Sequence, residues 1–136
     1  MIPRRCLKLC QIICKLNTMR KWETGANRND NARKLEFARF MSPLVVKRYC
    51  EYMDKHRYLE NGGSREPDNW KNLFGEEHEQ VCIDSLARHF LDLWITTEGG
   101  EPREDKEEAL CAIMFNAMAI LYKILKETNG GKSIGD

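Results

Sequence analysis

The sequence predicts an all-α protein, built as a small bundle of three main helices. Apolar residues recur at helical spacing in three segments, about 43–59, 77–97 and 104–127. No stretch keeps the apolar–polar alternation of a half-buried strand. Gly-containing breaks at about 60–70 and 96–105 separate the three segments. At 136 residues the chain is long enough for one domain around one core.

The N-terminal segment 1–21 is a basic arm with six Lys and Arg and no acid. Its apolar residues share one helical face, which predicts an amphipathic helix if the segment folds. Its open interpretations are a membrane-surface or partner-helix contact, a frayed arm, or a true start at Met19 rather than Met1. Residues 22–136 carry 16 basic and 21 acidic residues, a net of −5, which argues against binding to polymeric nucleic acid.

A single helical domain is expected over residues 22–128, followed by a flexible or capping tail at 129–136. Residues 22–41 are polar and turn-rich, typical of a loop or an extended arm. Ser42 and Pro43 then supply an N-cap and a first helical residue, and this helix should run to about Leu59. His56 lies within its apolar face and is interpreted as a core or interface residue.

The helix at 77–97 should end at Gly99-Gly100, and the helix at 104–127 is apolar on most sides. The last helix is therefore expected to be the most buried element, and covering it favours a homodimer or higher homo-oligomer. A membrane-spanning helix is not expected, because the uninterrupted apolar runs are much shorter than about 20 residues.

The six cysteines show neither a CxxC pair nor zinc-ligand spacing with histidine. Cys50, Cys82 and Cys111 lie singly in helical patterns and are expected to behave as small apolar residues. Without a clear secretory signal, this usage favours a reducing, cytoplasmic location.

One polar or small stripe follows the last helix and is the first candidate site. It consists of Asp105, Glu108, Ala112, Asn116, Ala119 and Lys123. The stripe is either the solvent face of the helix or one wall of a ligand groove. In a groove, Asp105 and Glu108 would bind Mg²⁺, a cation that prefers carboxylate oxygens, and Asn116 would hold a sugar or base.

Further candidates lie on the helix at 77–97. Glu76 and Glu79 form a second carboxylate pair that could share the metal, although acids are also favoured at a helix N-terminus without any ligand. Arg88 is a candidate phosphate contact or part of an ion-pair ladder. His89 is a candidate phosphate donor or general acid–base. No phosphate loop, nucleophile elbow or zinc-protease motif occurs.

The region from about Thr24 to Leu125 resembles the phage-encoded dATP/dGTP diphosphohydrolase N-terminal domain family, and more distantly the MazG-type all-α pyrophosphohydrolases. The resemblance rests on four motifs and on their order along the chain. The first is the Gly-containing arm with Lys34, and the second is Tyr58 with the loop that ends in Asp68-Asn69-Trp70-Lys71. The third combines Ser85, the pair Arg88-His89, Phe90 and Trp94, and the fourth is the segment Glu107–Leu121, which contains Asn116. Two departures are Ala109, where many relatives have histidine, and Asp105-xx-Glu108, where the MazG pattern has the acids exchanged.

The resemblance implies a dimeric, cytosolic enzyme that hydrolyses purine deoxynucleoside triphosphates to monophosphate and pyrophosphate with Mg²⁺. Asp105, Glu108 and His89 would then be catalytic, with Glu76 and Glu79 completing the metal site. Arg88 and Lys71 would contact phosphates, Asn69 and Asn116 would orient sugar or base, and Trp70 would stack on the base. The base preference stays open.

Two other hypotheses belong to different classes. The first is a non-catalytic nucleotide-binding protein, a sponge for a signalling nucleotide, which the departures from the acidic motif favour. The second is a helical interaction module that uses the 1–21 arm. Deletion of residues 1–18 separates them, because only the interaction module depends on the arm.

Overall fold

The computed structural model describes residues 19–29 and 34–130, and it divides the chain into two compact units, 1–42 and 43–136. The predicted N-terminal helix lies mostly outside the described residues. The boundary between the two units falls at Ser42. Of the tail, only residues 129 and 130 are described, and Asn129 is the C-cap of the last helix.

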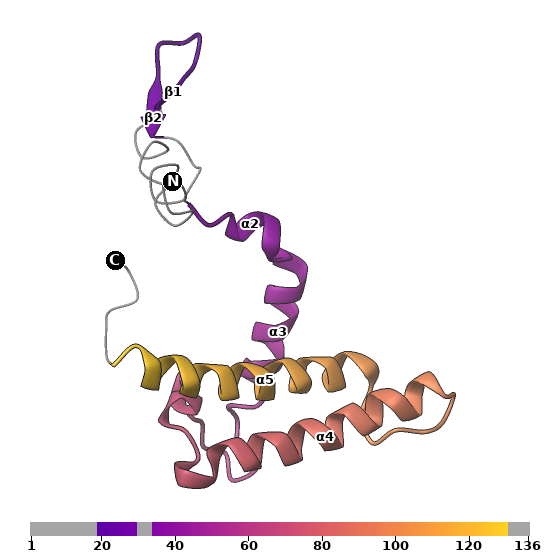
Figure 1. Cartoon of the computed structure of the whole chain (residues 1–136). Helices are drawn as coiled ribbons and strands as arrows, with labels where there is room; N and C mark the ends of the chain where they lie inside the picture. Colours follow the sequence, from indigo (N-terminus) through magenta and orange to yellow (C-terminus); the bar gives the residue numbers. More distant parts are fainter. Residues whose placement is uncertain (1–18, 30–33, 131–136) are drawn as a thin grey trace, which may run out of the picture. The chain divides into compact units, whose positions relative to one another are not determined.

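The first unit contains a β-hairpin that the sequence pattern did not predict (Figure 1). Strands β1 (Met19–Lys21) and β2 (Asn27–Asn29) pair antiparallel, with Arg20 opposite Arg28. Each strand has three residues, too few for an alternation to be visible. Gly25 at φ +84° allows the tight turn, and the Trp22 amide donates to the Ala26 carbonyl at 3.0 Å. A short helix, α2 (Phe37–Phe40), follows in place of the expected loop.

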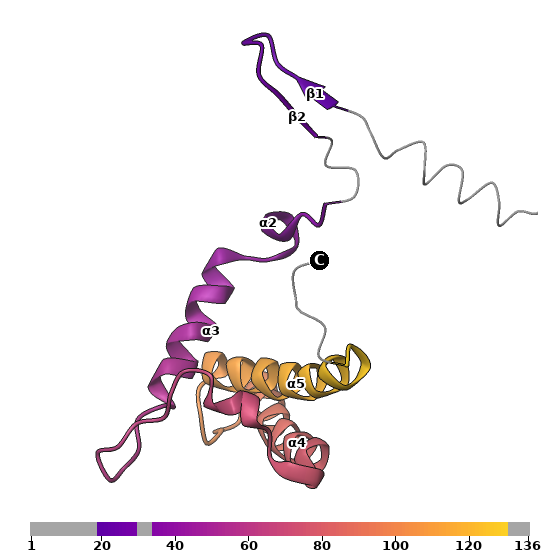
Figure 2. The ribbon, with the colours of Figure 1, turned by 90° about the vertical axis from the view of Figure 1, so that its left-hand side faces the viewer.

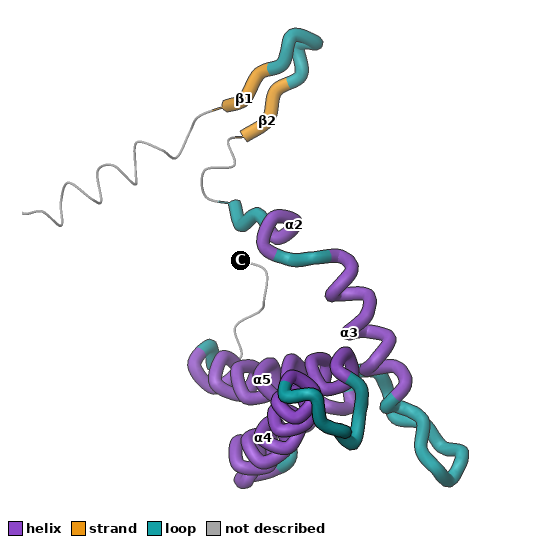
Figure 3. Tube along the Cα trace, turned by 90° about the vertical axis from the view of Figure 1, so that its right-hand side faces the viewer, coloured by secondary structure: helices purple, strands orange, loops and turns teal. Residues whose placement is uncertain are grey.

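The second unit confirms the three-helix prediction, with α3 (Pro43–Lys55), α4 (His78–Thr97) and α5 (Lys106–Thr128) (Figure 1). Helix α3 ends four residues before the expected Leu59, because the chain turns back on itself and Tyr58 forms a β-bridge with Ser64. Two 3₁₀ turns, η1 (Asn69–Asn72) and η2 (Gly75–Glu77), lead into α4. The loops of this unit are drawn in teal in Figure 3, like those of the first unit.

Helices α4 and α5 form an antiparallel hairpin and lie side by side in Figures 1 and 2. The Gly99-Gly100 ending of α4 is confirmed: Gly99 has φ +79°, and the Gly100 amide donates to the Ile95 carbonyl at 2.9 Å. The face of α5 toward its neighbours is made of small residues, with Ala109, Ala112 and Ala119 fully buried. Small side chains allow the two backbones to approach closely.

A separate apolar cluster joins α3 to α5 around Tyr52, Cys111 and Ala112. Burial raises the pKa of Tyr52 to about 12 and raises the pKa of the Cys82 and Cys111 thiols, so these groups stay neutral in the core. Of the three helical cysteines expected to behave as small apolar residues, Cys82 and Cys111 are buried and Cys50 is exposed.

The orientation of α5 differs from the simple amphipathic expectation. Its small and polar stripe faces the interior, while large apolar residues on its other side are exposed, namely Leu110, Met114, Leu121, Ile124 and Leu125. Among residues 19–29 and 34–130, α5 is the one helix long and apolar enough by length and composition to cross a membrane. The exclusion based on short apolar runs was therefore too strong. The core helix of a soluble protein meets the same criterion.

Candidate functional site

A cavity of about 380 Å³ opens in the second unit, within the size range of small-molecule sites. It lies between α3, the segment that follows it, α4 and α5. Its walls are Tyr52, Met53, His56, Arg57, Arg65, Glu66, Pro67, Asn69, Trp70, Phe74, Ser85, His89, Phe115 and Asn116. Four predicted site residues, Asn69, Trp70, His89 and Asn116, are thus brought together around one space.

One wall of the cavity is cationic, which sequence reasoning missed. Arg57 donates from Nε to the Arg65 carbonyl at 2.8 Å and from Nη1 to Asp54 at 2.8 Å, so its guanidinium is held in place. Arg65 approaches the His56 carbonyl at 3.5 Å. His56, expected to be a core or interface residue, is half exposed and lines the cavity, so it is not in the core of this unit. An anion entering the cavity would meet these side chains.

Aromatic side chains make up another part of the cavity wall. The Trp70 ring packs edge-on against Tyr122 at 5.0 Å and against Phe115 at 6.2 Å between centroids. Lys71 lies with its ammonium 5.9 Å from the Trp70 ring and borders a second, neighbouring cavity, not the first. Trp70 lines both cavities, so the predicted phosphate ligand Lys71 lies beside the first cavity without lining it.

Asn116, 4% exposed, supplies a fixed polar group at the base of the cavity. Its Nδ2 donates to the Ala112 carbonyl at 2.8 Å and to the Ser85 hydroxyl at 3.2 Å. With both donors engaged, the amide orientation is set and Oδ1 is left to accept a hydrogen bond from a ligand.

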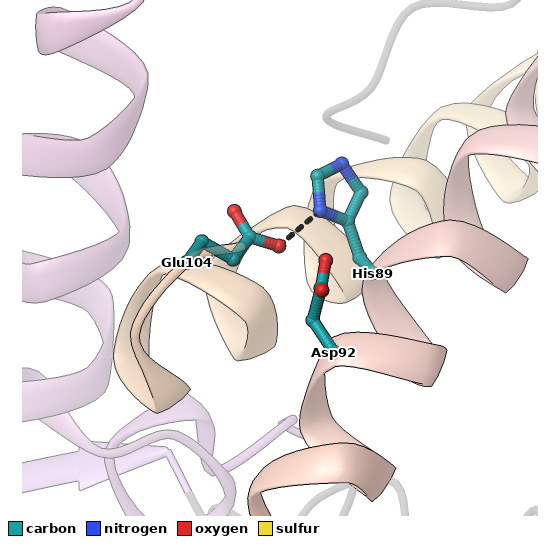
Figure 4. A group of neighbouring side chains, drawn as sticks. All are labelled: His89, Asp92 and Glu104. Carbon is teal, nitrogen blue, oxygen red and sulfur yellow. Dashed lines mark hydrogen bonds and ion pairs between the residues drawn. The ribbon is translucent and has the colours of Figure 1, made fainter. Parts of the chain in front are cut away.

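A group of side chains able to bind a metal adjoins the cavity through His89, in the middle of α4. His89, Asp92 and Glu104 each offer one ligand atom, and these atoms all lie within 4.8 Å of one another. Figure 4 shows the Glu104 carboxylate paired with the His89 ring and the Asp92 carboxylate directed toward both. Asp92 and Glu104 were not predicted. The spacing of Asp92 three residues after His89 was a usable signal, but Glu104 comes from the connection before α5.

Arg103 neutralises Asp92 within this group. Its Nη2 lies 2.6 Å from Asp92 Oδ2, and its backbone amide and Nε both donate to Oδ1 at 3.2 Å. The hydrogen bonds from the Arg103 side chain lower the pKa of Asp92, against the effect of burial, so the carboxylate is ionised at neutral pH. Arg103 Nη2 also reaches the Arg88 carbonyl at 3.2 Å.

The predicted Mg²⁺ ligands Asp105 and Glu108 are engaged in structural contacts. Asp105 caps α5 by accepting from the Glu108 amide at 2.9 Å. Glu108 pairs with Arg48 at 2.9 Å and Lys55 at 3.2 Å, which ties α3 to α5. With one carboxylate facing the helix backbone and the other held by two cations, the pair does not form an open oxygen site for Mg²⁺.

The second predicted carboxylate pair lies elsewhere. Glu76 and Glu79 are exposed at the start of α4, where Glu79 is near Lys123 of α5. His78, next to Glu79, contacts the Ala119 carbonyl of α5, and Glu108 and Asp105 lie 11 and 14 residues before Ala119. At a rise of 1.5 Å per residue this is about 16–21 Å along α5, so the structure does not bring Glu76 and Glu79 together with Asp105 and Glu108. Arg88 is exposed and is not part of the cavity wall.

Comparison of the chain with protein-family models, curated proteins and solved structures found no match. The resemblance to the dATP/dGTP diphosphohydrolase family stays a prediction from the motifs.

Glu108 gives a testable pH dependence. Burial tends to raise the pKa of Glu108, but the hydrogen bonds from Arg48 and Lys55 outweigh it and the pKa is lowered. The ion pairs therefore stabilise the fold at pH values above the ordinary glutamate pKa, about 4.3, and this contribution is lost as the pH falls through the lowered value. We expect Glu108→Gln to be less stable than the wild type at pH 7, with the difference shrinking toward pH 3. Urea unfolding of both proteins across this range measures it, and a constant difference would contradict the assignment.

Proposed function

We propose that the protein binds a purine deoxynucleoside triphosphate in the cavity and hydrolyses it to the monophosphate and pyrophosphate. The observation that supports this proposal is a cavity lined by arginine and aromatic side chains, with His89 in its wall belonging to a group able to bind a divalent cation. Arginine side chains bind phosphates, an aromatic ring stacks on a base, and a divalent cation assists phosphoryl transfer.

The cavity offers a distinct contact for each part of a nucleotide. Arg57 and Arg65 lie on the side where the phosphates would bind, and the arginine fork suits phosphate oxygens. Trp70 presents a ring on which a base can stack. Asn116 Oδ1 would accept from a base amino group or a sugar hydroxyl, and Asn69 also lines the cavity. The cationic and aromatic walls would thus fix the nucleotide's orientation.

Hydrolysis requires a group next to the phosphates that can handle charge and protons. His89 lines the cavity and is paired with Glu104, an arrangement suited to orienting the imidazole. A divalent cation, Mg²⁺ in the expectation from the resemblance, would neutralise phosphate charge and lower the pKa of a bound water. The residues near the cavity that could hold such a cation are His89, Asp92 and Glu104, and not the predicted Asp105 and Glu108.

The second candidate function is nucleotide binding without hydrolysis. The ion pairing of Glu108 with Arg48 and Lys55, and of Asp92 with Arg103, favours it, since these contacts neutralise carboxylates that a hydrolase would use for metal. The proposed contacts of a nucleotide with the cavity arginines, Trp70 and Asn116 do not depend on hydrolysis, so they suit this function equally well.

One experiment separates the two functions. The full chain is incubated with dATP, dGTP, the ribonucleotides and cyclic nucleotides, with and without divalent cations, and the products are separated and quantified. Cation-dependent release of pyrophosphate supports the hydrolase. Recovery of intact nucleotide bound to the protein supports the sponge, and neither binding nor turnover contradicts both.

Trp70 provides a direct test of the binding geometry. Stacking of a base on an aromatic side chain contributes about 1–3 kcal/mol, so Trp70→Ala should weaken nucleotide binding by about 5- to 150-fold. Fluorescence or calorimetric titration measures the affinity. Trp22→Ala, in the first unit, is the matched control and should leave it unchanged. An unaltered affinity in Trp70→Ala would place the base elsewhere.

We also propose that a second copy of the chain covers the exposed apolar surface of the α4–α5 hairpin. On α4, Ile83, Phe90 and Trp94 follow at helical spacing and are each about half exposed. On α5, Leu121 belongs to the exposed stripe described above. Neither stripe is interrupted by a charged residue, which suits a self-complementary contact between identical apolar faces.

The homodimer can be tested by placing a charge on this surface. Trp94→Glu should shift the protein from dimer to monomer in sedimentation or light scattering at micromolar concentration, because a buried unpaired carboxylate opposes association. Glu98→Gln, at the C-cap of α4, is a control expected to remain dimeric. A wild type that is monomeric at these concentrations would contradict the proposal.

A further inference from the structure

The group His89, Asp92 and Glu104 combines one imidazole nitrogen with two carboxylates. We propose that it is a binding site for a first-row transition-metal dication, with Mn²⁺ bound more tightly than Mg²⁺. The inference deepens the proposed function by naming the cation of that site, but it concerns metal binding alone and is tested without nucleotide.

The local fold brings the three side chains together. His89 and Asp92 are three residues apart on α4 and therefore share a face of the helix. Glu104 approaches from the segment just before α5, which the α4–α5 hairpin places against the end of α4 (Figure 4). Asp92 is only 2% exposed, whereas His89 and Glu104 are about three-quarters buried. A buried carboxylate with two partly accessible partners leaves one side of the site open to water or phosphate.

The spacing suits a single ion. Ligand atoms opposite each other on a dication lie about 4–4.5 Å apart, twice a metal–ligand bond of about 2.0–2.2 Å. The ligand atoms of the three residues, all within 4.8 Å of one another, need only small side-chain movements to reach this geometry. The remaining coordination positions would be filled by water or by phosphate oxygens.

The choice of metal follows from the donor set. Mg²⁺ prefers an all-oxygen octahedron and retains its water molecules, so an imidazole nitrogen is a poor ligand for it. Imidazole suits the later first-row ions such as Fe²⁺, Ni²⁺ and Zn²⁺. Mn²⁺ begins the same affinity series and also suits the two carboxylates, so it is the first-row ion nearest to Mg²⁺ with which to test the site. The presence of His89 therefore favours these ions, whereas the all-carboxylate site predicted from the sequence would have favoured Mg²⁺.

Arg103 supplies the positive charge that Asp92 requires when no metal is bound. Its side chain is 63% exposed, so its guanidinium can move into solvent while a metal takes its place on the buried carboxylate. A metal ion must therefore displace the Arg103 guanidinium from the Asp92 carboxylate in order to bind. Replacing Arg103 with an uncharged residue should remove this competitor and strengthen metal binding.

The test is a titration of the nucleotide-free full chain with Mn²⁺, followed by electron paramagnetic resonance of the free ion and by calorimetry. We expect one Mn²⁺ per chain, bound at least tenfold more tightly than Mg²⁺. Glu104→Gln and His89→Gln should each weaken Mn²⁺ binding at least tenfold. Glu101→Gln, an exposed acid in the same connection, should bind as the wild type does.

Arg103→Gln tests the displacement and should increase Mn²⁺ affinity, with the exposed Lys106→Gln as its charge-matched control. Circular dichroism of each variant checks that the helices are intact. Absence of Mn²⁺ binding in the wild type, or binding unaffected by both Glu104→Gln and His89→Gln, would overturn the site. Hydrolysis by a wild type that binds no Mn²⁺ would overturn the site and leave the proposed function standing. Mn²⁺ binding without hydrolysis would do the reverse.

Discussion

Replacement of His78 by leucine is expected to destabilise the second unit by about 2–4 kcal/mol. The His78 ring is fully buried at the start of α4 and connects two other elements. Its Nδ1 accepts from the Phe74 amide at 3.1 Å, and its Nε2 lies 2.9 Å from the Ala119 carbonyl in the middle of α5. This pattern requires the neutral tautomer with the proton on Nε2.

Leucine keeps most of the side-chain volume but can neither accept from Phe74 nor donate to Ala119. Each lost hydrogen bond to a buried group costs about 1–3 kcal/mol, and the Ala119 carbonyl retains its helical partner, which moderates the total. Urea unfolding followed by circular dichroism measures the change, with exposed Glu79→Gln as the control on the adjacent residue. A His78→Leu protein within about 0.5 kcal/mol of the wild type would mean that the ring does not hold α4 to α5.

His78 also illustrates what the sequence pattern could not predict. The helix it begins was predicted correctly within one residue, because apolar periodicity is a local property. Its role is not local: the partner carbonyl belongs to a residue 41 positions away. The short β1–β2 hairpin was missed for the opposite reason, since three-residue strands contain too little sequence for a period to be visible.

The sequence left open whether the small and polar stripe on α5 is a solvent face or a groove wall, and it did not predict which residues contact the stripe. Ala112, Asn116 and Ala119 do face inward, and Asn116 reaches the cavity, as the groove interpretation expected. On the same stripe, Asp105 instead caps α5, and Glu108 pairs with Arg48 and Lys55 of α3. Spacing along one helix establishes which residues share a face, but the charge opposite that face comes from a distant segment.

The candidate site shows the same limit. Asn69, Trp70, His89 and Asn116 were predicted individually and do line one cavity. Arg57 and Arg65 were not predicted. They lie on either side of a Gly-Gly turn, where the chain reverses its direction, and they come together only in the folded protein. In the same way, Glu104 joins His89 through a connection whose path no periodicity specifies.

The largest functional effect is expected at His89, if the protein is the proposed hydrolase. His89→Gln should reduce the rate of pyrophosphate release from dATP or dGTP by about 10²- to 10⁴-fold, the range for loss of a positioned acid–base group, while the helical circular-dichroism signal is retained. Glutamine keeps a polar side chain of similar length, so the change removes the imidazole without opening a large cavity. Product quantification under single-turnover conditions measures the rate.

The response of His89→Gln to Mn²⁺ distinguishes two ways in which the imidazole can act. If His89 acts as a metal ligand, raising the Mn²⁺ concentration should restore much of the rate, because the defect is one of metal affinity. If it transfers a proton, saturating Mn²⁺ should leave the rate low. Glu104→Gln should follow the first behaviour, since its carboxylate has no separate route to the substrate in the proposed site. Wild-type rates in His89→Gln would contradict both roles and would move the chemistry away from the wall of the cavity formed by α4.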